Sequence, residues 1–134
     1  MTIASFDDLL RSASQQTEPQ RLLFVFTTAE LPEGASPEQR ARFQVGEGGT
    51  LTPLMCVDKS PDEVPSFVAL LEESRRAGPR WDIVFIAALS GKAGSSPTST
   101  EAEAALQRMV ESIKTGRIGS FIPFDIHGQP VSFG

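Results

Sequence analysis

Three short apolar runs dominate the hydrophobic pattern of the chain. The longest extends without interruption from Ile83 to Leu89 and is ended by a serine and a glycine. A strand of this length with no polar alternation has no face suited to water, so we expect it to be covered on both sides. The runs 22–26 and 54–57 have the same character and predict two further buried strands.

Four segments have the apolar spacing or the start signals of helices, at about 6–13, 37–43, 61–77 and 101–115. Near each start, a hydroxyl residue is followed three positions later by an acid or an amide, as in an N-terminal capping box. The four pairs are Ser5 and Asp8, Ser36 and Gln39, Ser60 and Glu63, and Thr100 and Glu103. Between the second helix and the next strand, the glycines of segment 46–49 predict a flexible loop.

The end of the chain predicts a hairpin. Segments 121–126 and 129–133 flank His127-Gly128, a suitable two-residue turn. Pro123 and Pro130 lack a backbone donor, which places this hairpin at the edge of a sheet.

The order of these elements predicts the fold class. Strands that alternate with helices are typical of right-handed crossovers and parallel pairing. We therefore expect one α/β domain over residues 1–134, with a mostly parallel sheet of about five strands. Helices would cover both faces, and the C-terminal antiparallel hairpin would form one edge.

Composition narrows the class of protein. The chain has 134 residues, 40% of them hydrophobic and 22% charged, which is typical of a globular domain. Its net charge is −5 and its basic residues are scattered, so we expect no nucleic-acid binding. No apolar run is long enough for a bilayer, and the start of the chain lacks the features of a secretory signal. These features and the single cysteine predict a soluble, cytoplasmic protein with no membrane partner.

Few residues have the surroundings that chemistry requires. Cys56 lies in an apolar strand without a second thiol, which predicts a buried structural role. His127 is the only histidine, and its place in a turn favours a structural role over a catalytic or metal-binding one. The glycines of segment 91–96 suggest a phosphate-binding loop, but its lysine comes too early for that motif, which favours a solvated loop. We expect no catalytic residue, no metal and no cofactor.

The carboxyl ends of parallel strands would gather one set of polar residues at a single edge, where α/β sheets bind ligands. Hydroxyls and two lysines in this set would suit a small anion. The expected ligand-binding residues are Thr27, Thr28, Asp58, Lys59, Ser90, Gly91 and Lys92, with Glu30 beside them.

Segments 51–59 and 81–91 and the later Arg117-Ile118-Gly119 resemble a family of small uncharacterised proteobacterial proteins. The resemblance covers nearly the whole chain and implies no catalytic residues. Members often carry the automatic label "ribonucleotide reductase subunit alpha". That enzyme reduces its substrate with several cysteines, and its common aerobic form relays a radical through tyrosines. The chain has one cysteine and no tyrosine, so the label does not fit its chemistry.

The hypothesis that follows is a small, non-enzymatic binding or interaction protein with a protein partner. The first alternative is a binder of small anions, or an enzyme, that uses the crevice at the strand ends. The second is a thioredoxin-like domain that lacks the redox motif.

Overall fold

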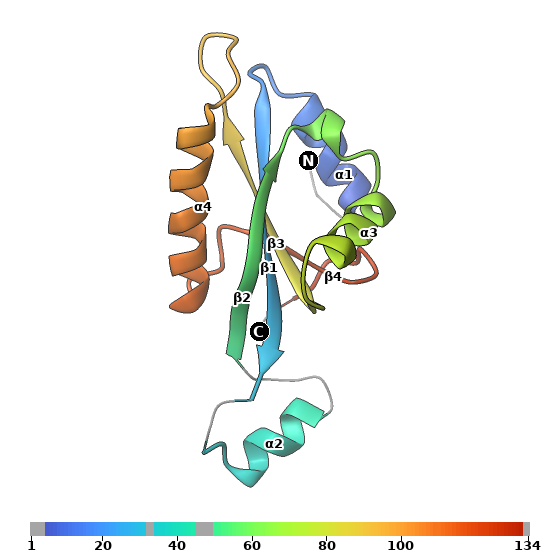
Figure 1. The fold of residues 1–134 in the computed structure, drawn as a ribbon, viewed down its shortest axis with the longest axis vertical. Helices are drawn as coiled ribbons and strands as arrows, with labels where there is room; N and C mark the ends of the chain where they lie inside the picture. Colours follow the sequence, from blue (N-terminus) through green and yellow to red (C-terminus); the bar gives the residue numbers. More distant parts are fainter. Residues whose placement is uncertain (1–4, 32–33, 45–49, 133–134) are drawn as a thin grey trace.

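The computed structural model describes residues 5–31, 34–44 and 50–132 and contains a four-stranded sheet (Figure 1). The strands are β1 (Gln20–Glu30), β2 (Thr50–Lys59), β3 (Ile83–Ser90) and β4 (Ile122–Asp125). Their order across the sheet is β2-β1-β3-β4, and every neighbouring pair is antiparallel.

This arrangement corrects the predicted α/β class, because the described sheet contains no parallel neighbours. The chain is an α+β domain. β2 and β3 do run in the same direction, as the connection through a helix requires, but β1 lies between them and runs the opposite way. The run from Ile83 to Leu89 is an interior strand as expected. Its neighbours are β1 and β4, whereas β2 lies at the far edge.

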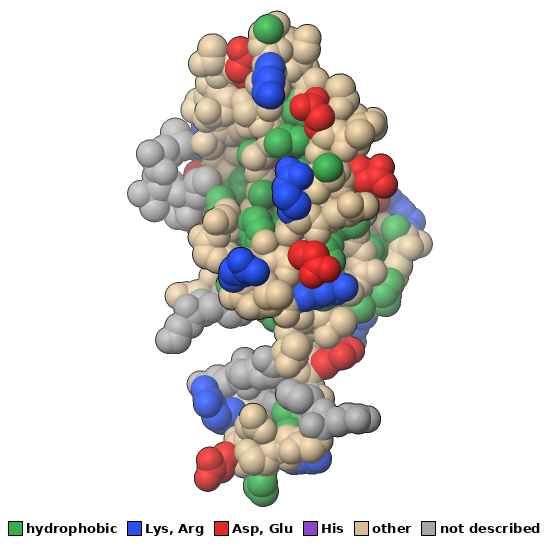
Figure 2. Space-filling model, turned by 90° about the vertical axis from the view of Figure 1, so that its left-hand side faces the viewer, with side chains coloured by type: hydrophobic (Ala, Val, Ile, Leu, Met, Phe, Trp, Pro, Cys, Tyr) green, Lys and Arg blue, Asp and Glu red, His purple; other side chains and the backbone are tan. Residues whose placement is uncertain are grey.

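Helices cover both faces of the sheet, as the continuous apolar runs predicted (Figure 1). α1 (Phe6–Ser14), the 3₁₀ helix η1 (Pro61–Glu63) and α3 (Phe67–Ala77) lie on one face, and α4 (Ser99–Lys114) lies on the other. A further helix, α2 (Pro37–Gln44), projects beyond the ends of β1 and β2 in Figures 1 and 2. Figure 2 faces the α4 side, where basic and acidic side chains are interspersed over the surface. The predicted loop at 46–49 lies outside the described residues.

Alternation along β1 supplies both cores. Leu22, Phe24 and Phe26 face α1 and α3, while Leu23 and Val25 face α4. All five side chains are buried. Because successive side chains of a strand point to opposite faces, only a continuous apolar run can fill two cores.

Three of the four predicted caps begin a helix. Ser5 accepts from the Asp8 backbone N–H, and Ser36 with Gln39 forms a reciprocal pair. Ser60 begins only the short η1, because the segment 64–66, which contains a proline, interrupts the expected long helix before α3. The predicted cap at position 100 is wrong.

The cap of α4 is Thr98, two residues earlier than predicted, and its partner is Glu101. The backbone N–H of Thr98 donates to the Glu101 carboxylate and lowers its pKa; the backbone N–H of Ser60 lowers the pKa of Glu63 in the same way. Both caps therefore contribute fully above the ordinary pKa of glutamate and weaken as the pH falls through the lowered values.

The C-terminal hairpin is only half formed as strand. β4 is followed by a turn in which the Asp125 carboxylate accepts from the backbone N–H groups of His127 and Gln129, at 2.8 and 3.0 Å. Gly128 has a φ of +75°, and an added Cβ would come within 3.0 Å of the Phe67 ring. Beyond the turn, the described residues contain a single bridge to β4 rather than a second strand, and positions 133–134 lie outside them.

Cys56 is exposed, so the prediction of a buried cysteine is wrong. It lies on β2, whose outer side has no neighbouring strand among the described residues. We expect the Cys56 thiol of the folded protein to react with Ellman's reagent at a rate close to that in denaturant. A stopped-flow comparison of the two states measures this, and slow labelling of the folded protein would contradict the exposed position.

Candidate functional site

The residues expected at one ligand-binding edge lie at opposite ends of the sheet. Asp58, Lys59 and Ser90 end β2 and β3, which run in the same direction, so they share one end. Thr27 and Thr28 lie near the end of β1, which runs the other way. The antiparallel direction of β1 therefore separates the expected set into two groups.

In the first group, each polar side chain is bound by another residue of the chain. The Arg21 guanidinium pairs with the Asp58 carboxylate, and the Lys59 ammonium pairs with Glu73 at 2.8 Å. The Ser90 hydroxyl accepts from the Gln20 side-chain amide at 3.0 Å. These contacts connect β1 to its two neighbours and link β2 to α3.

The loop after β3 is a closed turn. Backbone groups of Lys92 and Ser95 bond each other, and the Gly91 N–H donates to the Pro19 carbonyl at 2.8 Å. The Gly94 N–H donates to the Glu18 carboxylate at 2.7 Å. A carboxylate of the chain itself therefore occupies the donor that an anion would use in this loop.

The second group is arranged around Asp82. Its carboxylate accepts from the Thr28 hydroxyl at 2.8 Å and from the Ala29 backbone N–H at 2.9 Å. Thr27 is fully buried and its hydroxyl donates to the Ile83 carbonyl. These bonds hold the start of β3 against the end of β1.

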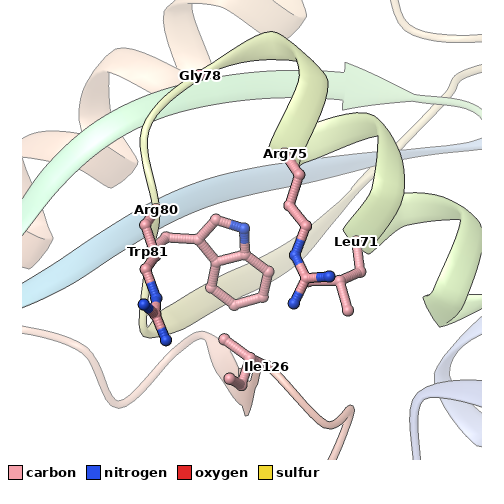
Figure 3. A pocket seen from close by; sticks show the side chains of 6 residues that line it. All are labelled: Leu71, Arg75, Gly78, Arg80, Trp81 and Ile126. Atoms are coloured by element: carbon pink, nitrogen blue, oxygen red, sulfur yellow. The ribbon is translucent and has the colours of Figure 1, made fainter.

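A cavity of about 370 Å³ lies beside these residues, between α3 and the turn after β4 (Figure 3). The indole of Trp81 forms its wall, and the guanidinium groups of Arg75 and Arg80 lie on either side of the indole in Figure 3. Leu71 and Ile126 supply apolar surface. We call this cavity the Trp81 pocket.

The wall of the Trp81 pocket is held rigidly. Trp81 is 2% exposed, and its Nε1–H donates to the Ser74 hydroxyl at 2.8 Å. That hydroxyl donates in turn to the Leu71 carbonyl at 2.7 Å. The Phe26 ring meets the indole edge-on, with centroids 5.1 Å apart. The indole thus has one orientation, fixed by α3 and β1.

The two arginines of the pocket have no close ionic partner in the described part of the chain. Arg75 and Arg80 are exposed and take part in none of the ion pairs among the described residues. The nearby acids Glu73, Asp82 and Asp125 bind Lys59, the end of β1 and the β4 turn, respectively. The two guanidinium groups are therefore available to an anionic ligand.

Sequence reasoning missed this pocket. The available signal was Arg80-Trp81, a cation beside the only tryptophan, five residues after Arg75. The contribution of Ile126 from the β4 turn could not be read from local spacing.

The residues with catalytic or metal-binding chemistry remain dispersed. Cys56 and His127 lie at opposite edges of the sheet, on β2 and after β4, so they do not form a nucleophile–base pair. Across the described ranges, no three side chains of the metal-binding types gather at one point. No helix within those ranges is long and apolar enough to span a bilayer. Comparisons with family models, with curated proteins and with solved structures found no match to the chain.

Proposed function

We propose that the chain is a binding protein whose Trp81 pocket takes a small ligand with one anionic group and an apolar body. The observation that carries this proposal is the pair of unpaired guanidinium groups, Arg75 and Arg80, on either side of a fixed indole. Guanidinium is the side-chain group best suited to carboxylate and phosphate oxygens.

The shape and lining of the pocket support this class of ligand. Its volume of about 370 Å³ lies within the range of small-molecule sites, and a few polar groups set against apolar walls are typical of them. The apolar body would contact mainly Leu71 and Ile126, because Trp81 is only 2% exposed, and the anionic group would lie between the arginines. A purely inorganic anion would leave these apolar contacts unused.

The site at the strand ends has weaker support. There the Gly94 donor already binds Glu18, and Lys59 and Asp58 have partners within the chain. A ligand would have to displace those contacts, whereas at the Trp81 pocket it would bind guanidinium groups that have no ion-pair partner within the described ranges. We therefore propose that the small anion predicted from the sequence binds in the Trp81 pocket and not at the strand ends.

The test is a titration with three ligands of similar shape: benzoate, phenyl phosphate and the neutral benzamide. The protein has one tryptophan and no tyrosine, so its fluorescence reports on Trp81 alone. We expect the anions to change this emission saturably and benzamide to have little effect. Binding should weaken with added salt, because the attraction involves exposed charges. The relative affinities of benzoate and phenyl phosphate identify the preferred anionic group.

Substitution of the arginines locates the binding site. Arg75→Ala and Arg80→Ala should each weaken anion binding about tenfold, the effect of losing one charge-assisted hydrogen bond. Because both side chains are exposed, the melting temperature should stay nearly unchanged. Arg76→Ala is the matched control, an exposed arginine of α3 that does not line the pocket. Equal weakening by all three substitutions would indicate nonspecific attraction and contradict the proposal.

A further inference from the structure

A second feature is independent of the Trp81 pocket: part of the β3 edge has no neighbouring strand. β4 pairs only with the first half of β3, Ile83–Ile86. The second half, 87–89, pairs with β1 on one side and has no strand on its other side within the described ranges (Figure 1). Unpaired strand edges bind other extended segments readily.

The pairing pattern shows which backbone groups point outward. The Gly91 N–H donates to the Pro19 carbonyl, one step beyond the Gln20–Ser90 pair. Gln20 and Ser90 therefore form a non-hydrogen-bonded pair. Hydrogen-bonded and non-hydrogen-bonded pairs alternate along an antiparallel ladder. Ala88, two residues before Ser90, is therefore also in a non-hydrogen-bonded pair. Its backbone N–H and C=O point away from β1, toward the open edge.

Two cavities flank this edge, one on each face of the sheet. A cavity of about 230 Å³ lies on the α1 side, and one of about 480 Å³ lies on the α4 side. Ala87 and Ala88 line both. The larger cavity lies between α4 and the last residues of β3, since α4 packs mainly over β1 and β2. We call the edge and its two cavities the β3 slot.

The walls of the β3 slot differ in charge. On the α1 side the lining is apolar or neutral, and its polar side chains are Ser12 of α1, Gln16 just after that helix and Gln20 of β1. On the α4 side the lining contains Arg108 and Arg117, both exposed and without an ion pair among the described residues. Among the residues that the structure describes, no acidic one lines either cavity.

The β2 edge has protection that the β3 slot lacks. β2 contains Pro53 and charged residues at its end, and the β1–β2 ladder has an irregularity next to that proline. Prolines, charges and bulges are the usual means of preventing a strand edge from pairing. The exposed backbone at Ala88 has only small or apolar neighbours along its strand.

We propose that the β3 slot binds an extended acidic segment of a partner protein, which adds to β3 as a fifth strand. Side chains of the added strand would alternate between the faces. Acidic residues on one face would meet Arg108 and Arg117, and apolar residues on the other would enter the cavity beside α1. This site and the Trp81 pocket share no lining residue, so either can fail alone.

The experiment uses the full chain and a blocked hexapeptide of alternating valine and glutamate, with the valine–lysine version as the control. NMR-detected amide exchange is followed at Ala87, Ala88 and Leu89. In the free protein the Ala88 amide should exchange fast while its two neighbours, bonded to β1, exchange slowly. The acidic peptide should slow exchange at Ala88 at least about tenfold.

Charge reversal tests whether Arg108 and Arg117 attract the acidic peptide. Arg108→Glu combined with Arg117→Glu should weaken binding of the acidic peptide more than about tenfold, while Lys114→Glu, an exposed cation of α4 outside the slot, should have a small effect. Protection at Ala88 with this ranking supports the proposal. Equal binding of the lysine peptide, or no binding at about 1 mM, would overturn it. If the Ala88 amide became protected as the protein concentration rose, with no peptide present, the β3 slot would bind a second copy of the chain and the proposal would be wrong.

Discussion

Ile86→Asp should prevent the chain from folding. The Ile86 side chain is 0% exposed and packs between β1 and β4 on the face covered by α1 and α3. The substitution removes a buried apolar side chain and places a carboxylate among apolar neighbours, each of which costs several kcal/mol. Since small domains are stable by only about 5–15 kcal/mol, we expect loss of the cooperative melting transition and of dispersed amide signals.

Two matched variants separate burial from other effects at this strand. Ile86→Val should fold and lose only about 1 kcal/mol of stability. Ala88→Asp places the same charge two residues later on the same face, at an exposed position, and should cost less than about 1 kcal/mol. A cooperatively melting Ile86→Asp protein would show that this side chain is not in the core.

Gly91→Ala should destabilise the fold by about 3 kcal/mol, the upper part of the range for overpacking. Gly91 follows β3 and is buried. An added Cβ would lie 2.0 Å from the Ser95 carbonyl oxygen and 3.0 Å from the Pro19 oxygen. Both are backbone atoms, held by hydrogen bonds of Gly91 and Lys92, so neither can move without breaking the turn. Thermal unfolding should show a melting temperature about 10 °C lower.

Gly119→Ala is the control for this effect. An alanine Cβ at position 119 would meet no atom within 4 Å, and its backbone does not require glycine. We expect its stability to change by less than about 1 kcal/mol, with a small gain from reduced freedom of the unfolded chain. If the Gly91→Ala and Gly119→Ala proteins had the same melting temperature, the close approach of the Ser95 carbonyl oxygen to Gly91 would be contradicted.

Much of the local structure could be predicted from the sequence. The apolar runs at 22–26 and 83–89 form strands with helices on both faces, the first buried throughout and the second buried at 84–86, and His127 lies in a turn after the last strand, as expected. These features depend on residues close in sequence: an apolar run must be buried wherever it packs, and a glycine with positive φ favours a turn in any fold.

Strand direction was not predictable in the same way. A buried strand has the same pattern of side chains whether its neighbour runs parallel or antiparallel to it, so the alternation of helices and strands was the only guide. That guide predicted parallel neighbours, and the insertion of β1 between β2 and β3 made it wrong. The same reversal separated Thr27 and Thr28 from Lys59 and Ser90 at the expected binding edge.

By itself, therefore, the sequence determined where most helices and strands lie and that the runs 22–26 and 84–86 are buried. It was wrong about 54–57, which was predicted to be a buried strand and lies in an edge strand with no fully buried residue. Only the tertiary structure decided what lies beside each segment. It left Cys56 exposed on an edge strand, brought Ile126 to the arginines flanking Trp81, and left Ala88 with no strand on its outer side among the described residues. These contacts depend on how the two cores pack against the sheet. Because they join residues that are distant in the chain, they produce no periodic pattern in the sequence.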